Sequence, residues 1–135
     1  GSETVTFRDT RPALSPERIF FASAAWRATG ELRLELAGRH TGPAQLDNTG
    51  ASRLATEAYT MVDLTAELAA GRWVRTGSPR LRLQVNNLLD ERRAWPSGYS
   101  YPYLVRGSAG DRLDGIPYYY PMAPRHFVLG LELSF

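Results

Sequence analysis

The last eleven residues of the chain alternate between large apolar side chains and smaller or polar ones. The apolar positions are Phe127, Leu129, Leu131, Leu133 and Phe135. Successive side chains of a β-strand point to opposite faces, so residues 125–135 predict a strand with one apolar face. At the edge of a soluble sheet, such an uncovered strand would promote aggregation. A transmembrane β-barrel needs strands of this kind, because lipid contacts every second residue.

Four earlier segments also have the length and composition of strands: 19–28, 31–40, 59–70 and 80–90. The alternation is clearest in 31–40, where leucines at 32, 34 and 36 alternate with charged residues at 31, 33 and 35. A tilted strand of about ten residues is long enough to cross a bilayer. The sequence therefore predicts five antiparallel strands that could span a membrane.

The connections between these segments alternate between short and long. Thr29-Gly30 and residues 71–79 are short, whereas 41–58 and 94–124 are long and are interpreted as loops. Barrels with short periplasmic turns and long outer loops have this asymmetry. The predicted fold is thus all-β, an antiparallel transmembrane β-barrel segment. A soluble antiparallel barrel or sandwich, with the same apolar faces turned inward, remains the alternative, because periodicity does not show which side meets lipid.

Composition excludes several classes of function. The 16 basic residues, all arginine, nearly balance 14 acidic ones, so no electrostatic footprint for nucleic acid is present. The sequence has no cysteine and no apolar run long enough for a membrane helix. We interpret Gly1-Ser2 as a possible cloning scar and 3–135 as the domain. Since no signal peptide is visible, we expect a mature, processed or partial chain.

Four motifs resemble those of TonB-dependent outer-membrane receptors. Residues 83–90, Leu-Gln-Val-Asn-Asn-Leu-Leu-Asp, resemble the V-x-N-L-F-D motif of the penultimate strand, with Leu89 in place of the aromatic residue. Residues 59–64 resemble the Y-x-x-V-D-L strand, and 39–42 resemble R-Y-x-G with His40 at the aromatic position. Residues 119–125 and Phe135 resemble the last loop and the closing strand. The four motifs occur in the family's order and spacing.

The resemblance implies a 22-stranded barrel with an N-terminal plug, of which this chain supplies about five C-terminal strands and no plug. Such a segment is not closed by itself. The implied function is part of an active transporter in the outer membrane of a Gram-negative bacterium, taking up a siderophore-type metal chelate or another scarce nutrient and energised by TonB. The implied partners are the remainder of the barrel and plug, the TonB complex, the barrel-assembly machinery and outer-membrane lipid.

Two alternatives to the transport function remain open. One is a soluble, lipocalin-like β-barrel module that binds a small ligand, with the apolar faces as its core. The other is a barrel fragment that serves as a substrate of the barrel-assembly machinery. We expect no enzyme, because the only histidines, His40 and His126, lack partners at catalytic or metal-binding spacing. We likewise expect no cofactor and no bound metal.

The best candidates for ligand contact lie in the long segment 94–124 and just beyond it. Tyrosine and tryptophan combine broad contact area with a polar tip, which suits a binding surface, although the same residues form the aromatic girdle at a bilayer interface. Arginines would suit an anionic ligand such as a metal chelate. The candidate ligand-binding residues are Trp95, Tyr99, Tyr101, Tyr103, Arg106, Arg112, Tyr118, Tyr119 and Arg125.

Two other groups of residues have predicted roles. Asn87, Leu88 and Asp90 carry the receptor motif, and we expect a structural role in which polar groups bind neighbouring strands and fix their register. By resemblance, the closing strand is the signal for the barrel-assembly machinery, through Phe127, Leu129, Leu131, Leu133 and Phe135. Charged residues that alternate onto the lumen-facing side are Asp63, Glu67, Arg82 and Glu132.

Overall fold

The computed structural model describes residues 6–72, 77–93, 95–108 and 110–134. Within these residues the chain forms seven β-strands and no helix, and hence no helix that could cross a membrane. The all-β antiparallel class predicted from the sequence is confirmed. The strands are β1 (Ile19–Arg27), β2 (Leu32–Thr41), β3 (Tyr59–Ala69), β4 (Arg80–Asn86), β5 (Ser97–Val105), β6 (Arg112–Tyr120) and β7 (His126–Glu132).

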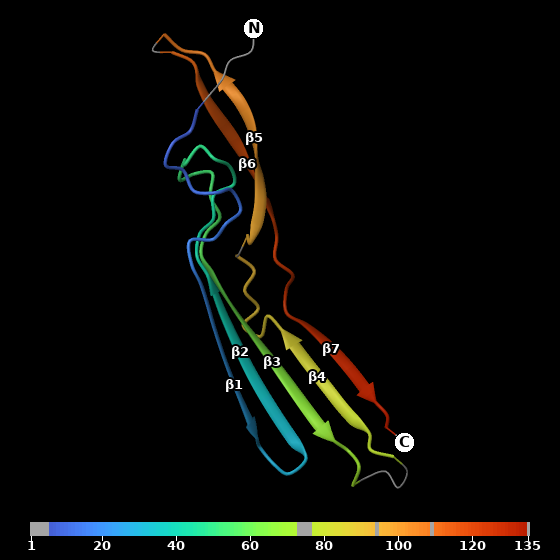
Figure 1. The fold of residues 1–135 in the computed structure, drawn as a ribbon. Coiled ribbons are helices and arrows are strands. Elements are labelled where there is room, and N and C mark those ends of the chain that lie inside the picture. Colours follow the sequence, from blue (N-terminus) through green and yellow to red (C-terminus); the bar gives the residue numbers. More distant parts are fainter. Residues whose placement is uncertain (1–5, 73–76, 94, 109, 135) are drawn as a thin grey trace. The chain divides into compact units, whose positions relative to one another are not determined.

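The segments predicted as strands form one sheet, called here the large sheet, in the order β1-β2-β3-β4-β7 (Figure 1). β3 pairs antiparallel with β4, and β4 pairs antiparallel with β7. The register sets Glu67 opposite Arg82, and Leu83 opposite Leu129. The sheet is open, because β1 and β7 are its outer strands and have no further partner strand among the described residues.

One face of the large sheet is apolar. Directly paired residues of antiparallel strands point to the same side, so the row formed by Ala66, Leu83 and Leu129 lies on one face. On β1, the ring of Phe20 lies 6.3 Å from that of His40 on β2, which places both on the side of the leucines of β2. Residues on this face include Trp26, Leu34, Leu36, Leu64, Leu81, Phe127 and Leu131.

The opposite face of the large sheet is mostly polar. Glu67, Arg82 and Gly130 form one row across β3, β4 and β7. Arg33 on β2 reaches the Glu67 carboxylate at 3.4 Å, which places the charged residues of β2 on the same face. The alternation read from the sequence therefore continues across neighbouring strands as two chemically distinct faces.

The outer strands of the apolar face are not covered by other described parts of the chain, whereas Val85 on β4 is buried and the apolar residues of β3 are half-buried. Phe127, Leu129 and Leu131 are 66%, 69% and 62% exposed, and Phe20 is 63% exposed. In a soluble sandwich such side chains would be buried against a second layer of structure. Here the most regular part of the chain leaves its large apolar side chains open to the surroundings.

The prediction that 94–124 is a loop is wrong. Most of it forms an antiparallel hairpin, the tyrosine hairpin, in which β5 pairs with β6 over nine positions from Ser97–Tyr120 to Val105–Arg112. Pro102 and Pro117 lie on the same face of the hairpin, where they pair opposite Gly115 and Ser100. In a two-stranded hairpin each proline nitrogen can face the unpaired side, where no hydrogen bond is lost.

The strand predicted over 80–90 ends earlier, at Asn86. Asn87 and Asp90 both have φ near +53°, a left-handed conformation that a strand cannot continue through. Asparagine and aspartate adopt this conformation more readily than other non-glycine residues, because their short polar side chains can bond locally. The end of β4 is therefore encoded by the same residues that carry the receptor motif.

The chain divides into two compact units. The hairpin unit comprises residues up to Ile19 together with Thr41–Tyr59 and Arg93–Met122, and the sheet unit comprises Phe20–His40, Thr60–Arg92 and Ala123–Phe135. The small core of the hairpin unit comes from the segment predicted as a loop over 41–58, where Leu54 is fully buried. Leu46, Ala44 and Thr56 are also buried there.

Candidate functional site

The tyrosine hairpin presents an exposed aromatic face. Tyr99, Tyr101 and Tyr103 alternate onto one side of β5, and Tyr118 lies directly opposite Tyr99 on β6. The rings of Tyr99 and Tyr118 are stacked, with centroids 5.1 Å apart and planes 12° apart. All of these rings are exposed, as is Tyr120, whose ring lies 6.2 Å from that of Tyr99. The structure thus gathers four predicted ligand-binding tyrosines on one face.

Tyr119 points to the other side of the hairpin and fastens it to the segment 41–58. Its hydroxyl donates a hydrogen bond to the carbonyl oxygen of Ala55 at 3.1 Å. Arg53 in turn donates from Nη1 to the carbonyl oxygen of Gly115 at 2.8 Å. A side chain at Gly115 would meet Leu54, and a Cβ at Gly98 would overlap the carbonyl oxygen of Tyr118. These contacts require glycine at both positions and hold the hairpin unit together.

A groove of about 660 Å³ opens in the hairpin unit. Its walls come from the N-terminal segment, from 43–58 and from the open end of the tyrosine hairpin, where β5 begins and β6 ends. Trp95 and Tyr119 both line it, with ring centroids 6.3 Å apart and planes 51° apart. Sequence reasoning identified these two aromatic residues but missed the polar side of the groove, formed by Glu17, Gln45, Ser52, Arg53 and Glu57. No motif in 43–58 signals it, because the pairing with the hairpin is long-range.

Acidic residues neutralise the arginines closest to the groove. Arg53 forms an ion pair with Asp114, which is 16% exposed, and Arg112 approaches the same carboxylate at 3.6 Å. Glu17 is paired with Arg11. Nearby, burial would raise the pKa of Asp47, but hydrogen bonds from the Thr49 hydroxyl and backbone outweigh it and hold that pKa below its usual value. The positive charge of Arg53, which lines the groove, is therefore compensated.

The three arginines predicted to contact a ligand lie in different parts of the structure. Arg112 is the first residue of β6, and Arg106 lies in the turn between β5 and β6. Arg125 belongs to the sheet unit, where its Nη1 donates to the carbonyl oxygen of Leu88 at 3.3 Å. The three arginines expected to attract an anionic ligand thus do not form one cluster within a single unit.

Asn87 is the best-satisfied polar side chain of the receptor motif and is 1% exposed. Its Nδ2 donates to the carbonyl oxygens of Glu91 (2.9 Å) and Ala123 (3.1 Å), and its Oδ1 accepts from the Glu91 amide. Its own amide donates to Asp63 Oδ1 at 2.8 Å. One side chain therefore links the end of β4 to the entry of β7, while its backbone is tied to β3.

Asp90 makes further contacts at the end of β4. Its Oδ1 accepts the amide hydrogen of Arg125 at 2.9 Å, and its Oδ2 accepts from Arg92 Nε at 3.0 Å. The hydrogen bond from Arg92 and then that from Arg125 lower the pKa of Asp90 below its usual value. Leu88 contributes its amide, which donates to the carbonyl oxygen of Val62 at 2.7 Å. We call Asn87, Leu88, Asp90 and the groups they bind the motif clamp.

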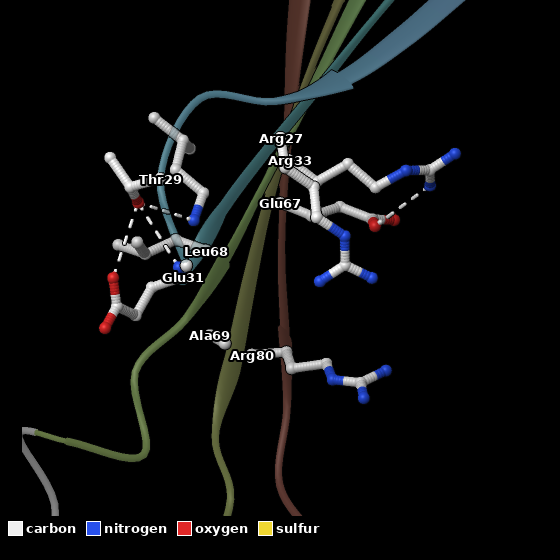
Figure 2. A pocket seen from close by; sticks show the side chains of 10 residues that line it. Arg27, Thr29, Glu31, Arg33, Glu67, Leu68, Ala69 and Arg80 are labelled. Carbon is white, nitrogen blue, oxygen red and sulfur yellow. Dashed lines mark hydrogen bonds and ion pairs between the residues drawn. The ribbon is translucent and has the colours of Figure 1, made fainter.

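The polar face of the large sheet carries ion pairs across strands. Glu67 lies between Arg33 and Arg82, at 3.4 Å and 3.7 Å. Figure 2 shows Arg33, Glu67 and Arg80 extending to the same side near the β1–β2 turn. At that turn Glu31 binds Arg72 at 2.7 Å, which lowers the pKa of Glu31. Asp63, the other acidic residue of β3 on this face, instead accepts the Asn87 amide of the motif clamp, and Glu132 lies opposite Arg80.

The predicted assembly-signal residues Phe127, Leu129 and Leu131 lie on the apolar face of β7, and Leu133, just past the strand, is exposed as well. Phe135 lies outside the described residues. The two histidines make local contacts: His40 Nδ1 lies 3.0 Å from the Thr60 hydroxyl, and His126 Nε2 lies 3.1 Å from Asn86 Nδ2. In the described part of the chain, no cluster of three or more histidine or acidic residues could hold a metal ion. No family model, curated protein or solved structure matches this chain.

Proposed function

We propose that the chain is the C-terminal part of a transmembrane β-barrel in the outer membrane of a Gram-negative bacterium, and that the barrel is a TonB-dependent transporter. Its cargo would be a metal chelate or another scarce nutrient too large for passive pores. The remainder of the barrel and the plug would come from another chain or from a longer form of this one. The barrel-assembly machinery would insert it, and the TonB complex would energise it through the plug.

One observation carries the membrane part of this proposal: an apolar face that crosses the large sheet, with large side chains exposed on β1, β2, β4 and β7, opposite a mostly polar face. Such a face requires lipid, because the removal of apolar surface from water is favourable. The charged face would line a hydrated lumen, where the Arg33–Glu67–Arg82 pairs remain solvated. Closure into a barrel would also remove the two open edges at β1 and β7.

The chain path supports the same assignment. Neighbouring strands of the large sheet are joined alternately by short connections, 28–31 and 70–79, and by long ones, 42–58 and 87–125. Both long connections contribute to the hairpin unit, which carries the exposed tyrosines and the groove. In a barrel of this kind the long connections are extracellular. The groove and the aromatic face would then be where a ligand is first met.

The transport part of the proposal rests on the receptor motifs. Val85, Asn87, Leu88 and Asp90 match the penultimate-strand pattern, and two of these residues hold the left-handed backbone that ends β4. A soluble module that uses the apolar faces as its core is disfavoured, because the described residues do not cover those faces.

The experiment is extraction of the protein from membranes in mild detergent, followed by gel electrophoresis with and without boiling. We expect the chain to need detergent, and to travel with a larger companion polypeptide from which it separates only on boiling. The companion would be the remainder of the barrel. A chain that is monomeric and soluble without detergent, with the same β-structure by circular dichroism, would overturn the proposal.

A further inference from the structure

The groove of the hairpin unit contains a carboxylate that no described side chain neutralises. Glu57 lines the groove, is exposed and forms no ion pair within the described residues. The other two charged residues of the wall are committed: Glu17 is paired with Arg11, and Arg53 with Asp114. The uncompensated charge of the groove is therefore negative.

The aromatic wall of the groove has a defined geometry. The Tyr119 ring is positioned by the hydrogen bond from its hydroxyl to the Ala55 carbonyl oxygen, at 3.1 Å. Trp95 lies beside it, 6.3 Å between ring centroids, and is 41% exposed. Two inclined electron-rich rings and a carboxylate that line one groove attract an organic cation, because both the ring quadrupoles and the charge favour it.

We propose that this groove binds a ligand through an ammonium group, with Glu57 as its counter-ion and Trp95 and Tyr119 as its aromatic wall. For a transporter, this proposal means that the cargo carries a positively charged amine. The step from binding to uptake rests on the proposed function. A groove of about 660 Å³ accommodates a small organic molecule. The expectation of an anionic chelate is not favoured here, because Arg112 shares Asp114 with Arg53 and Arg125 lies in the sheet unit.

The test is calorimetric titration of the protein in detergent micelles with three probes. Choline is the cationic probe, 3,3-dimethyl-1-butanol is its neutral analogue of the same shape, and citrate is the anionic probe. We expect choline to bind best, and its affinity to fall with added salt because the site is open to solvent. Glu57→Gln should weaken choline binding about fivefold, and Trp95→Ala by a similar factor of about five.

Asp111→Asn is the matched control, because it removes one negative charge from the same unit at an exposed position outside the groove. It should leave choline binding unchanged, and all variants should retain the wild-type circular dichroism spectrum. Equal binding of choline and its neutral analogue, tighter binding of citrate, no binding of choline, or equal effects of Glu57→Gln and Asp111→Asn would each overturn the inference. A detergent-requiring chain that binds no choline contradicts the inference alone, whereas a soluble chain that binds choline contradicts only the membrane proposal.

Discussion

The two units of this chain distribute burial in opposite ways. The large sheet is built from long, regular strands, and its apolar side chains such as Phe127 and Leu129 are exposed. The hairpin unit contains the irregular segment 42–58, and there Leu54, Leu46 and Ala44 are buried. The sheet unit also buries Val85 on β4 and Ala70, but the fully buried Leu54 lies in the less regular unit. The difference teaches that the hairpin unit buries apolar side chains of its own, whereas the outer strands of the large sheet leave theirs exposed.

The strongest test of this difference between the two units is to remove the core of the hairpin unit. Leu54→Ala deletes a fully buried side chain and should cost about 2–5 kcal/mol of unfolding free energy for that unit. The measurement is denaturant unfolding followed by tyrosine fluorescence. Leu14→Ala, at an exposed leucine of the same unit, is the control and should change little. An equal effect of the two substitutions would mean that the hairpin unit has no core of its own.

The second prediction concerns the apolar face of the large sheet. Leu129→Arg should destabilise the protein in lipid vesicles by about 2–4 kcal/mol, because it places a charge on the proposed lipid-facing side. Val128→Arg, on the adjacent residue and the opposite face, should have an effect near zero. Unfolding by guanidinium in vesicles measures both. If the two variants behave alike, the faces do not differ in environment and the membrane proposal fails.

The third prediction tests the motif clamp. Asn87→Ala removes the side-chain hydrogen bonds to Glu91 and Ala123 and leaves buried partners unsatisfied, at a backbone position with φ of +53°. We expect a loss of about 2–4 kcal/mol in unfolding free energy. Asn86→Ala is the neighbouring control, because Asn86 bonds only with the side chains of Gln84 and His126 in the described contacts. A larger loss of unfolding free energy for Asn86→Ala than for Asn87→Ala would contradict the assignment of the clamp to Asn87.

The smallest expected effect is a pH dependence at Asp90. Its pKa is lower in the folded protein than in the unfolded chain, so its carboxylate stabilises the fold fully above the unfolded value of about 4. This contribution is lost as the pH falls through the lower, folded-state pKa. The stability difference between wild type and Asp90→Asn should therefore narrow below about pH 4. Unfolding curves measured between pH 7 and pH 3 check this, and a difference that widens toward pH 3 would contradict it.

Alternation predicted the large sheet well, because it is a local signal. The five strand segments and their two faces follow from side-chain parity in 19–27, 32–41, 59–69, 80–86 and 126–132. The tyrosine hairpin also alternates at Tyr99, Tyr101 and Tyr103, yet 94–124 was interpreted as a loop, and Pro102 and Pro117 lie within its strands. Their tolerance depends on which pairing positions they occupy, and only the register with β6 reveals that.

The candidate site was predicted only in part. Trp95 and Tyr119 were identified because exposed aromatic residues in a polar segment suit binding. Glu57 and Arg53 were not, because their place in the groove depends on contacts such as Arg53 to Gly115, which are 62 residues apart in sequence. Likewise Arg125 was assigned to ligand contact, although its described hydrogen bonds reach Leu88 and Asp90. Pairing between distant segments leaves no mark in the local residue pattern.

The motif clamp has a consequence for how such a chain can change over evolutionary time. Through Asn87, it joins the start and the end of the long connection that contains the tyrosine hairpin, with the bond to Ala123 spanning 36 positions. When the two ends of an insertion are fixed, lengthening it adds only a slowly growing entropic cost. Different hairpins could therefore be grafted between the same anchor points without disturbing strand register. With the clamp in place, the sheet would stay the same while the inserted binding segment varies.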